Sequence, residues 1–238
     1  MIKIKSIWKR FPGQNDDNAA LKDVSLEIKK GTSVAIVGRS GSGKSTLINI
    51  MTALIRPTKG EYIFNDKYNI HTTKINDRQT VCLRRETGYI SQASDLLNNF
   101  NVLKNIRMAA ECRGMTLSNE KIMEWLKKVR LEDKAKQLPG ELSGGEKQRV
   151  NIVRALACDP LAVFADEPTG ALDVFTAEGI IDILMELSTK TTLVLVTHNP
   201  EAAERCNRQL CFRRGKLEHD RKQLTKEDII EFMKEKNI

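Results

Sequence analysis

One stretch of the sequence, Gly38–Thr46, reads GRSGSGKST and fits the pattern G-x-x-x-x-G-K-[ST] without a mismatch. Its glycines allow backbone N–H groups to turn inward around an anion. Lys44 is placed to reach the β- and γ-phosphates of a nucleotide, and the Ser45 hydroxyl is placed to ligate Mg²⁺. The stretch therefore predicts a phosphate-binding loop.

Two adjacent carboxylates, Asp166 and Glu167, end a fully apolar run that begins at Leu161. A carboxylate at the C-terminal edge of a parallel strand lies where α/β sheets bind ligands. Asp166 can hold Mg²⁺ through water, and Glu167, which points elsewhere, can polarise an attacking water. For this segment by itself, two acids that cap a strand are the alternative interpretation.

Two further polar residues, Gln92 and His198, are predicted at strand ends. Gln92 could ligate Mg²⁺ or position water, or it could be a surface amide. A lone histidine at a strand end is usually structural. A shared sheet edge with Lys44, Gln92 and Asp166 favours a phosphate contact for His198.

A second loop, Leu142–Glu146, reads LSGGE and runs into an amphipathic helix. A helix N-terminus has unpaired N–H groups, so Ser143, Gly144 and Gly145 form a second candidate anion site. Without further context, the same residues describe a capped helix start.

The elements predicted around these residues alternate between strands and helices. The apolar, β-branched segment Ser33–Val37 is typical of a buried parallel strand, and Leu47–Leu54 is typical of a helix. A phosphate-binding loop requires this strand–loop–helix context. Residues 1–37 are otherwise predicted to be strands, and Met1–Lys5 alternates like an edge strand.

The pattern changes between Ala93 and Gln137, where β-branched runs vanish. Ile122, Trp125, Leu126 and Val129 form an i, i+3, i+4, i+7 stripe behind the candidate N-cap Ser118. This indicates a helical subdomain inserted between the halves of an α/β core. The other predicted elements are a helix around Arg78–Arg85, a helix near Ala177–Leu187, a hairpin over 209–219 and a terminal helix over Thr225–Ile238.

The composition, 238 residues of which 40% are hydrophobic and 29% charged, suits one globular unit or a core with a subdomain. The net charge of +8 is spread along the chain, which favours a solvated basic surface over a nucleic-acid site. No apolar run approaches the ~20 residues of a membrane span, and the N-terminus lacks a signal peptide's apolar region. We therefore expect a soluble, cytosolic chain whose five cysteines are reduced and mostly buried.

Considered together, these segments resemble the ATP-binding subunit of ABC transporters over essentially all of the chain. The matching motifs are the Walker A loop (38–46), the Q-loop glutamine (Gln92), the signature (142–146), Walker B (161–167), the D-loop (171–173) and the switch histidine (His198). The departures from the family's pattern are modest: Glu146 replaces the usual Gln, Phe11 replaces the frequent Tyr, and Asn199 replaces a frequent Asp.

The resemblance implies one domain over 1–238 with a P-loop NTPase core (1–92 and 143–238). That core would hold a mixed, mainly parallel sheet and an antiparallel β subdomain, with a helical insert over 93–142. The implied cofactors are ATP and Mg²⁺. Phe11 would stack on adenine, and Ser143 and Gly145 would contact the γ-phosphate of ATP held by the opposite subunit. The implied catalytic residues are Glu167, His198, Lys44 and Gln92. The implied nucleotide ligands are Phe11, Gly38, Arg39, Ser40, Gly41, Ser42, Gly43, Lys44, Ser45, Thr46, Ser143, Gly144 and Gly145, and the implied metal ligands are Ser45, Gln92 and Asp166.

The implied partners are a second nucleotide-binding subunit, identical or paralogous, and an integral membrane permease. The permease's coupling helix would dock near residues 92–106. The subunit would be cytoplasmic and peripheral on the inner face of the membrane. Residues 168–173 and the compact length resemble the lipoprotein-release, macrolide-export and antimicrobial-peptide-resistance type. That type implies export or extraction of a lipophilic, peptide or lipoprotein cargo, and the lack of a C-terminal regulatory domain mildly favours it.

The alternative is a soluble ABC-type ATPase that acts on nucleic acid or ribosomes. Such proteins insert long coiled coils or fuse two cassettes, whereas one small insert separates Lys44 from Ser143 here. No nucleic acid is therefore expected as a partner. Glu167 and His198 are both present, which argues against an inactive regulatory cassette.

Overall fold

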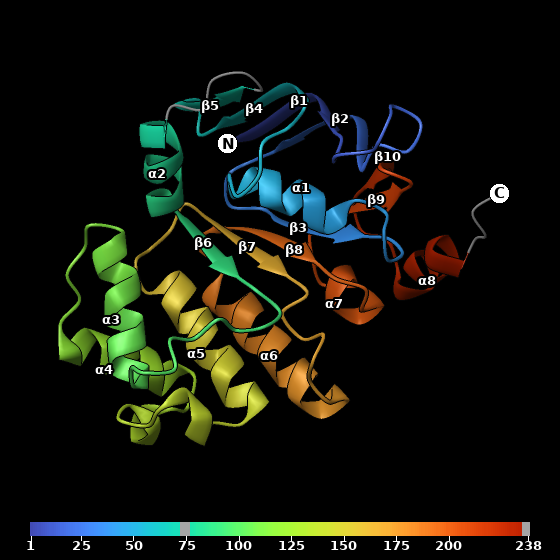
Figure 1. The fold of residues 1–238 in the computed structure, drawn as a ribbon. Helices are drawn as coiled ribbons and strands as arrows, with labels where there is room; N and C mark the ends of the chain where they lie inside the picture. The colour runs from blue at the N-terminus through green and yellow to red at the C-terminus, as the bar shows by residue number, and fades with distance from the viewer. Residues whose placement is uncertain (72–76, 235–238) are drawn as a thin grey trace. The chain divides into compact units, whose positions relative to one another are not determined.

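The computed structural model describes residues 1–71 and 77–234, and Figure 1 shows their helices and strands. The chain divides into two compact units. The first unit comprises Met1–Arg84 and Thr192–Ile238, and the second comprises Arg85–Thr191. Each unit is described here by itself.

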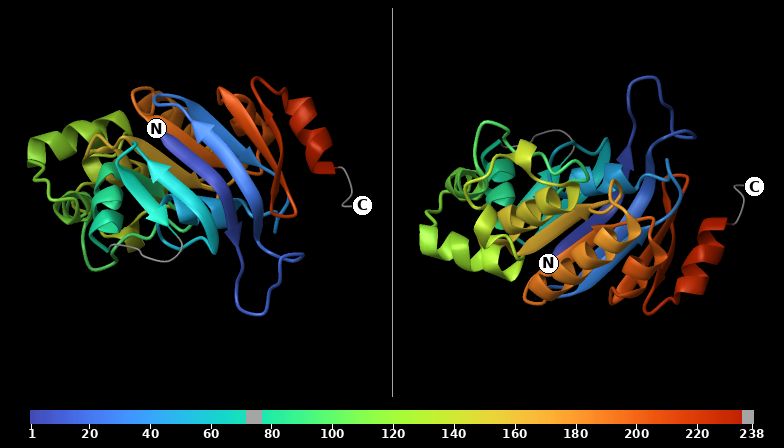
Figure 2. Two further views of the ribbon diagram at one scale, coloured as in Figure 1. Left: turned by 90° about the horizontal axis from the view of Figure 1, so that it is seen from above. Right: turned by 90° about the horizontal axis from the view of Figure 1, so that it is seen from below.

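An antiparallel sheet of the first unit contains β1 (Ile2–Lys9), β2 (Leu21–Ile28), β4 (Lys59–Phe64) and β5 (Tyr68–His71). Its order is β2-β1-β4-β5, so the prediction of an edge strand at the N-terminus is wrong. Ile4 pairs with Leu26 on one side and with Tyr62 on the other, and Figure 2 (left) shows β1 between its neighbours. Alternation of residues sets the two faces of a strand, but it does not say how many neighbours the strand has.

A tight turn over Asn65, Asp66 and Lys67 joins β4 to β5. Asn65 and Asp66 have φ of 55° and 52°, the left-handed conformation that hairpin turns of this type require. The short strand β5 was not predicted.

The remaining strands of the first unit are β3 (Ser33–Val37), β8 (Thr192–Val196), β9 (Arg208–Arg213) and β10 (Lys216–Arg221). β3 lies between β8 and β9 and is parallel to both, and β10 pairs antiparallel with β9. The predicted hairpin over 209–219 is confirmed. β3 and β8 are buried along nearly their whole length, which agrees with their continuous apolar sequences.

The first unit also carries α1 (Lys44–Met51), α7 (Pro200–Glu204) and α8 (Lys226–Lys234). α1 begins at Lys44, three residues before the predicted start. α8 agrees with the predicted terminal helix, whose residues 235–238 lie outside the described part. α2 (Asp77–Glu86) contains the boundary between the units and confirms the helix predicted around Arg78–Arg85.

Two parallel strands, β6 (Thr87–Ile90) and β7 (Ala162–Asp166), form the strand layer of the second unit. Its helices are α3 (Val102–Cys112), α4 (Asn119–Lys128), α5 (Gly144–Leu156) and α6 (Val174–Leu187), with 3₁₀ turns at Glu132–Lys134 and Pro139–Glu141.

Residues 93–142, all of which the structure describes, contain helices and no strand. Ser118 caps α4 by accepting a hydrogen bond from the Lys121 amide at 3.2 Å, as predicted. Ile122, Trp125 and Leu126 are buried. The boundaries of the helical insert stay a prediction.

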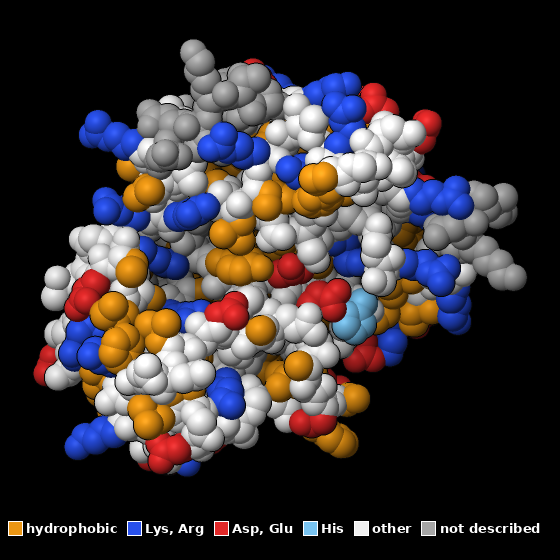
Figure 3. Space-filling model, in the orientation of Figure 1, with side chains coloured by type: hydrophobic (Ala, Val, Ile, Leu, Met, Phe, Trp, Pro, Cys, Tyr) orange, Lys and Arg blue, Asp and Glu red, His pale blue; other side chains and the backbone are white. Residues whose placement is uncertain are grey.

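These elements agree with the predicted fold class of a mixed, mainly parallel sheet, an antiparallel β sheet and additional helices. Within residues 1–71 and 77–234, no helix has the length and apolar character needed to cross a membrane. The five cysteines are free thiols, of which Cys158, Cys206 and Cys211 are buried. On the face shown in Figure 3, Lys and Arg side chains are interspersed with Asp and Glu.

Candidate functional site

The predicted phosphate loop lies between β3 and α1 in the first unit. Lys44 is 5% exposed, and its Nζ donates to the Gly38 and Arg39 carbonyls at 2.8 and 3.0 Å. Gly43 is the N-cap of α1 with φ of 103°, and no side chain of the described residues caps this helix. A helix start without a side-chain cap directly after a glycine-rich loop is the arrangement that binds anions in other proteins.

Close packing against neighbouring backbone explains two glycines of the loop. A Cβ on Gly38 would come within 2.3 Å of the Phe212 carbonyl oxygen, and one on Gly43 within 2.5 Å of the Ala20 oxygen. Gly215, in the β9–β10 turn, donates its N–H to the Ser42 carbonyl at 3.0 Å. Sequence reasoning had assigned Gly215 only to the hairpin, so its support of the loop was missed.

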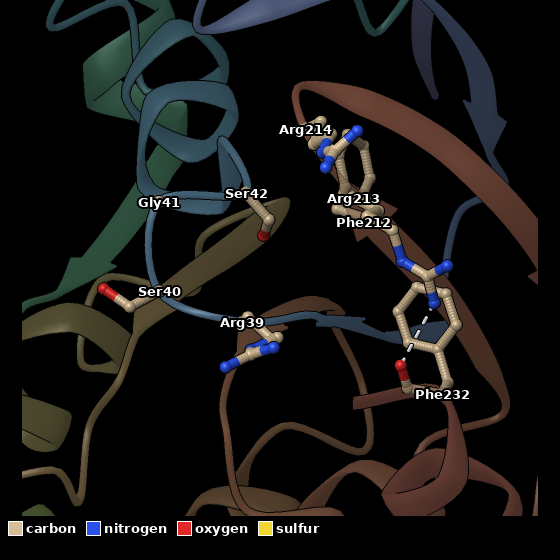
Figure 4. Close-up of a pocket in the computed structure, with 8 residues that line it drawn as sticks. All are labelled: Arg39, Ser40, Gly41, Ser42, Phe212, Arg213, Arg214 and Phe232. Atoms are coloured by element: carbon tan, nitrogen blue, oxygen red, sulfur yellow. Dashed lines mark hydrogen bonds between the residues drawn. The ribbon is translucent and has the colours of Figure 1, made fainter. Parts of the chain in front are cut away.

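A cavity of about 50 Å³ adjoins the loop. Figure 4 shows that the Ser42 side chain points into it, whereas the Ser40 side chain points away from Phe212 and Arg213. Ser42 Oγ is buried and has no hydrogen-bond partner among the described residues. An uncapped helix start, a buried lysine and an unsatisfied hydroxyl together fit a phosphate ligand. The residues that line the cavity are Arg39, Ser40, Gly41, Ser42, Phe212, Arg213, Arg214 and Phe232.

His198 follows β8 and lies at the same sheet edge as the phosphate loop. β3 and β8 run parallel with Ile36 opposite Val196, and the Thr197 amide donates to the Ile36 carbonyl at 3.2 Å. His198 is exposed. The first unit therefore brings this histidine and the loop to the same carboxyl edge, where α/β sheets bind ligands.

Phe11 lies in the loop between β1 and β2 of the same unit and is 41% exposed. The Lys9 Nζ lies 5.1 Å from its ring centroid, and burial lowers the pKa of Lys9. The Phe11 amide donates to Gln14 Oε1 at 2.9 Å, which holds the loop at its base. The exposed ring is available for stacking.

In the second unit, Gln92 and the two carboxylates share one sheet edge. β6 and β7 are parallel with Ile90 opposite Ala165; Gln92 follows the end of β6 by two residues, Asp166 is the last residue of β7, and Glu167 comes directly after it. A Cβ on Gly170 would lie 2.8 Å from Gln92 Nε2 and 3.4 Å from Glu167 Oε2. The Gln92 amide and the Glu167 carboxylate thus both border Gly170.

Glu167 adopts φ of 47°, in the left-handed region that non-glycine residues seldom occupy. Such a conformation costs about 1–3 kcal/mol and is concentrated at functional sites. The Gly170 amide donates to the Glu167 carbonyl at 3.0 Å, which closes a turn directly after β7.

The pKa of Tyr89, on β6, is affected by burial and by the negative charges near this edge. Burial, with contributions from the charges of Asp166 and Asp95, raises the pKa of Tyr89 to about 12. The phenol is therefore protonated at neutral pH and can act as a hydrogen-bond donor.

Ser143 is the N-cap of α5, in a reciprocal capping arrangement with Glu146. The Glu146 amide donates to Ser143 Oγ at 3.3 Å, and the Ser143 amide donates to Glu146 Oε2 at 2.8 Å. The bond from the Ser143 amide holds the pKa of Glu146 below its ordinary value. The glutamate that replaces the usual glutamine thus completes the cap.

The helix start at Ser143 packs against the segment that leads into α6. A Cβ on Gly144 would lie 3.2 Å from Leu172 Cδ2, and one on Gly145 would lie 2.5 Å from Thr176 Cγ2. Asp173 caps α6 by accepting a hydrogen bond from the Thr176 amide at 3.0 Å. The second unit thus brings the predicted signature and D-loop motifs together. Sequence reasoning missed Thr176, which carries no motif of its own.

Comparison with known proteins gives consistent matches. The family described as "ABC transporter" matches residues 21–170. The chain is 40% identical over 222 residues to the lipoprotein-releasing system ATP-binding protein LolD of Legionella pneumophila (strain Lens), covering 91% of this chain and 96% of the relative. It is 38% identical over 224 residues to the macrolide export ATP-binding/permease protein MacB of Hyphomonas neptunium, covering 92% of this chain and 34% of that protein. A solved dimeric ATP-binding cassette, MJ0796, in a post-hydrolysis state bound to ADP and Pi, matches with a TM-score of 0.82 at 35% identity, covering 94% and 99% of the two chains.

Proposed function

This chain belongs to the ABC transporter family as an ATP-binding, ATP-hydrolysing subunit, and from this premise we propose that it dimerises on ATP to drive a separate membrane permease. One observation carries the proposal. A single chain holds both a phosphate loop at the start of α1 and a second helix start at Ser143, where Gly144 and Gly145 occupy the first turn, so each copy can offer one ATP-binding surface of each kind.

In its own pocket, each copy binds the triphosphate with the loop. Lys44 contacts the β- and γ-phosphates, and Thr46 contacts the α-phosphate. Ser45, Gln92 and Asp166 would hold Mg²⁺, which would supply positive charge beside the phosphate oxygens. These three residues supply the oxygen donors that Mg²⁺ prefers.

Hydrolysis requires a positioned water. Glu167, whose backbone is left-handed, orients or deprotonates this water. His198 donates to the γ-phosphate, since it lies at the edge of the first unit that carries the loop. Phe11 stacks on the adenine ring.

The opposing copy completes the pocket. Its Ser143 and Gly145 contact the γ-phosphate, so that ATP joins the two subunits and hydrolysis separates them. The dimeric cassette MJ0796 bound to ADP and Pi supports this arrangement.

The cargo class follows from the relatives. LolD is named for lipoprotein release and MacB for macrolide export, so we propose export or extraction of a lipophilic, peptide or lipoprotein cargo. The match covers only 34% of MacB, and the name of that protein includes a permease as well as an ATP-binding part. We therefore propose that this chain works with a permease on a separate chain. Binding to that permease would place the subunit at the cytoplasmic face of the membrane.

The test is co-purification of the tagged chain with its permease from detergent-solubilised membranes, followed by ATPase assays of the complex and of the chain alone. Turnover that rises when the permease is present supports the proposal. A chain that never associates with a membrane protein, and instead binds duplex DNA or ribosomes in a salt-sensitive manner, overturns it.

A further inference from the structure

The turn that follows β6 has an unusual backbone that depends on support from elsewhere. Ser94 and Asp95 adopt φ of 63° and 43°, two consecutive left-handed residues that are not glycine. Ser91 and Ser94 are buried, and Ser91 Oγ donates to Asp95 Oδ2 at 2.5 Å. This turn begins beside Gln92, so its shape determines where the Gln92 side chain starts.

Two buried amides of α5 converge on the residue that precedes Gln92. Gln148 Nε2 and Asn151 Nδ2 donate to the Ser91 carbonyl at 3.1 and 3.2 Å. Ser94 Oγ donates to Gln148 Oε1 at 2.7 Å. Gln148 is 1% exposed and Asn151 is fully buried, so water does not compete for these bonds.

Arg154 of α5 holds the far side of the same turn. Its guanidinium donates to the Asp95 carbonyl at 2.6 Å and to the Ser94 carbonyl at 3.0 Å. It also donates to Asn151 Oδ1 at 3.0 Å, which orients the amide so that its nitrogen faces Ser91. The left-handed pair is thus fixed through its own carbonyls.

On its other side, Gln92 meets the Glu167 turn. Its amide nitrogen borders Gly170, as does the Glu167 carboxylate. The backbone that precedes Gln92 is therefore held by α5, and the exposed Gln92 side chain lies beside the Glu167 turn.

We propose that Gln148 and Asn151 are positioning residues that hold Gln92 in the geometry required for hydrolysis. Because Ser143 caps the same helix, α5 connects the signature serine rigidly to the glutamine turn. Contact of Ser143 with the nucleotide of the opposite subunit would then bias Gln92 in its own subunit, and this second step rests on the proposed function.

A purely structural role would make a different prediction. Gln209 is an equally buried amide, in the first unit, that holds the segment between α7 and β9 by donating to the Ala203 and Cys206 carbonyls at 2.9 and 2.8 Å. If buried amides mattered only for stability, Asn151→Ala and Gln209→Ala would lower the melting temperature alike and leave turnover of the folded fraction unchanged.

The experiment is a double-mutant cycle on steady-state ATP hydrolysis by the full chain, with Asn151→Ala, Gln92→Ala and both changes combined. We expect Asn151→Ala to lower kcat about tenfold, as misplacement of an active-site group does. KM for ATP should stay within about twofold, because the phosphate loop is untouched. In the Gln92→Ala background, Asn151→Ala should lower kcat by less than about twofold, because the group that it positions is already absent.

Gln148→Met, which keeps the side-chain length and removes the amide, serves as the second variant if Asn151→Ala does not fold. The matched control Gln209→Ala should keep the wild-type kcat. The inference is overturned if Asn151→Ala leaves kcat unchanged. It is also overturned if Asn151→Ala lowers kcat by the same factor in the Gln92→Ala background as in the wild type. ATP-dependent dimerisation, followed separately by light scattering, tests the proposed function, so the two failures are distinguishable.

Discussion

Gly145 lies directly against the methyl group of Thr176: a Cβ on the glycine would come within 2.5 Å of Thr176 Cγ2. Thr176 cannot easily turn away, because its Oγ1 donates to Asp173 Oδ2 at 2.6 Å. The signature glycine is thus required by packing within its own subunit, apart from any contact that it makes with nucleotide.

Gly145→Ala should therefore destabilise the chain by about 1–3 kcal/mol, as overpacking does. Thr176→Ser removes the clashing methyl group and keeps the bond to Asp173, so the double variant should recover most of the loss. Urea unfolding of the two single variants and the double variant measures this coupling. Strictly additive losses would show that Thr176 is not the obstacle.

Lys44→Ala should weaken nucleotide binding itself. Hydrogen bonds to charged groups contribute about 1.5–3 kcal/mol, which corresponds to a Kd raised about ten- to hundredfold. Isothermal titration with a non-hydrolysable ATP analogue gives the value, and circular dichroism verifies that the variant is folded. An unchanged Kd would remove Lys44 from the phosphate site.

Glu167→Gln should keep ATP binding and lose turnover. General acid–base groups contribute about 10²–10⁴-fold, so kcat should fall by about that factor. With hydrolysis blocked, ATP should trap a dimer that elutes earlier in size-exclusion chromatography. Normal turnover would exclude Glu167 from the mechanism, and a variant that stays monomeric in ATP would contradict the proposed dimer.

Protonation of Glu146 should weaken the cap of α5. The hydrogen bond from the Ser143 amide lowers the pKa of Glu146 below 4.5 in the folded chain. A lowered folded pKa gives stability that is present above the unfolded pKa and is lost as pH falls through the folded pKa. The stability difference between the wild type and Glu146→Gln should thus be constant near neutral pH and change only below 4.5. Urea unfolding at several pH values tests this, and a change centred near neutral pH would contradict it.

Local patterns in the sequence predicted most of the elements. The phosphate loop, β3, β7 and the hairpin were all predicted, because apolar runs and glycines encode them locally. β5 was missed because four residues between two turns carry too little periodicity. The N-terminal strand was mistaken for an edge because its partners, β2 and β4, are set by long-range pairing.

The contacts that order the candidate site were less predictable. Gln148 and Asn151 lie 57 and 60 residues from Ser91 along the chain, so no local pattern relates them to it. Gly215 looked like an ordinary turn glycine, and Thr176 looked like an ordinary helix residue. Their roles follow only from the packing of distant segments.

The β9–β10 turn has a thermodynamic consequence for ligand capture. The Gly215 amide donates a hydrogen bond to the Ser42 carbonyl. Gly215 also lies so close to Ala20 that an added Cβ would be only 2.8 Å from the Ala20 carbonyl oxygen. Residues 38–43 are consequently preorganised before any ligand arrives, and little conformational entropy remains to be lost on association. A bulkier residue at position 215 would make residues 38–43 less ordered before binding. The loop would then lose more conformational entropy when the ligand binds. The affinity for the ligand would fall although every phosphate-contacting residue was intact.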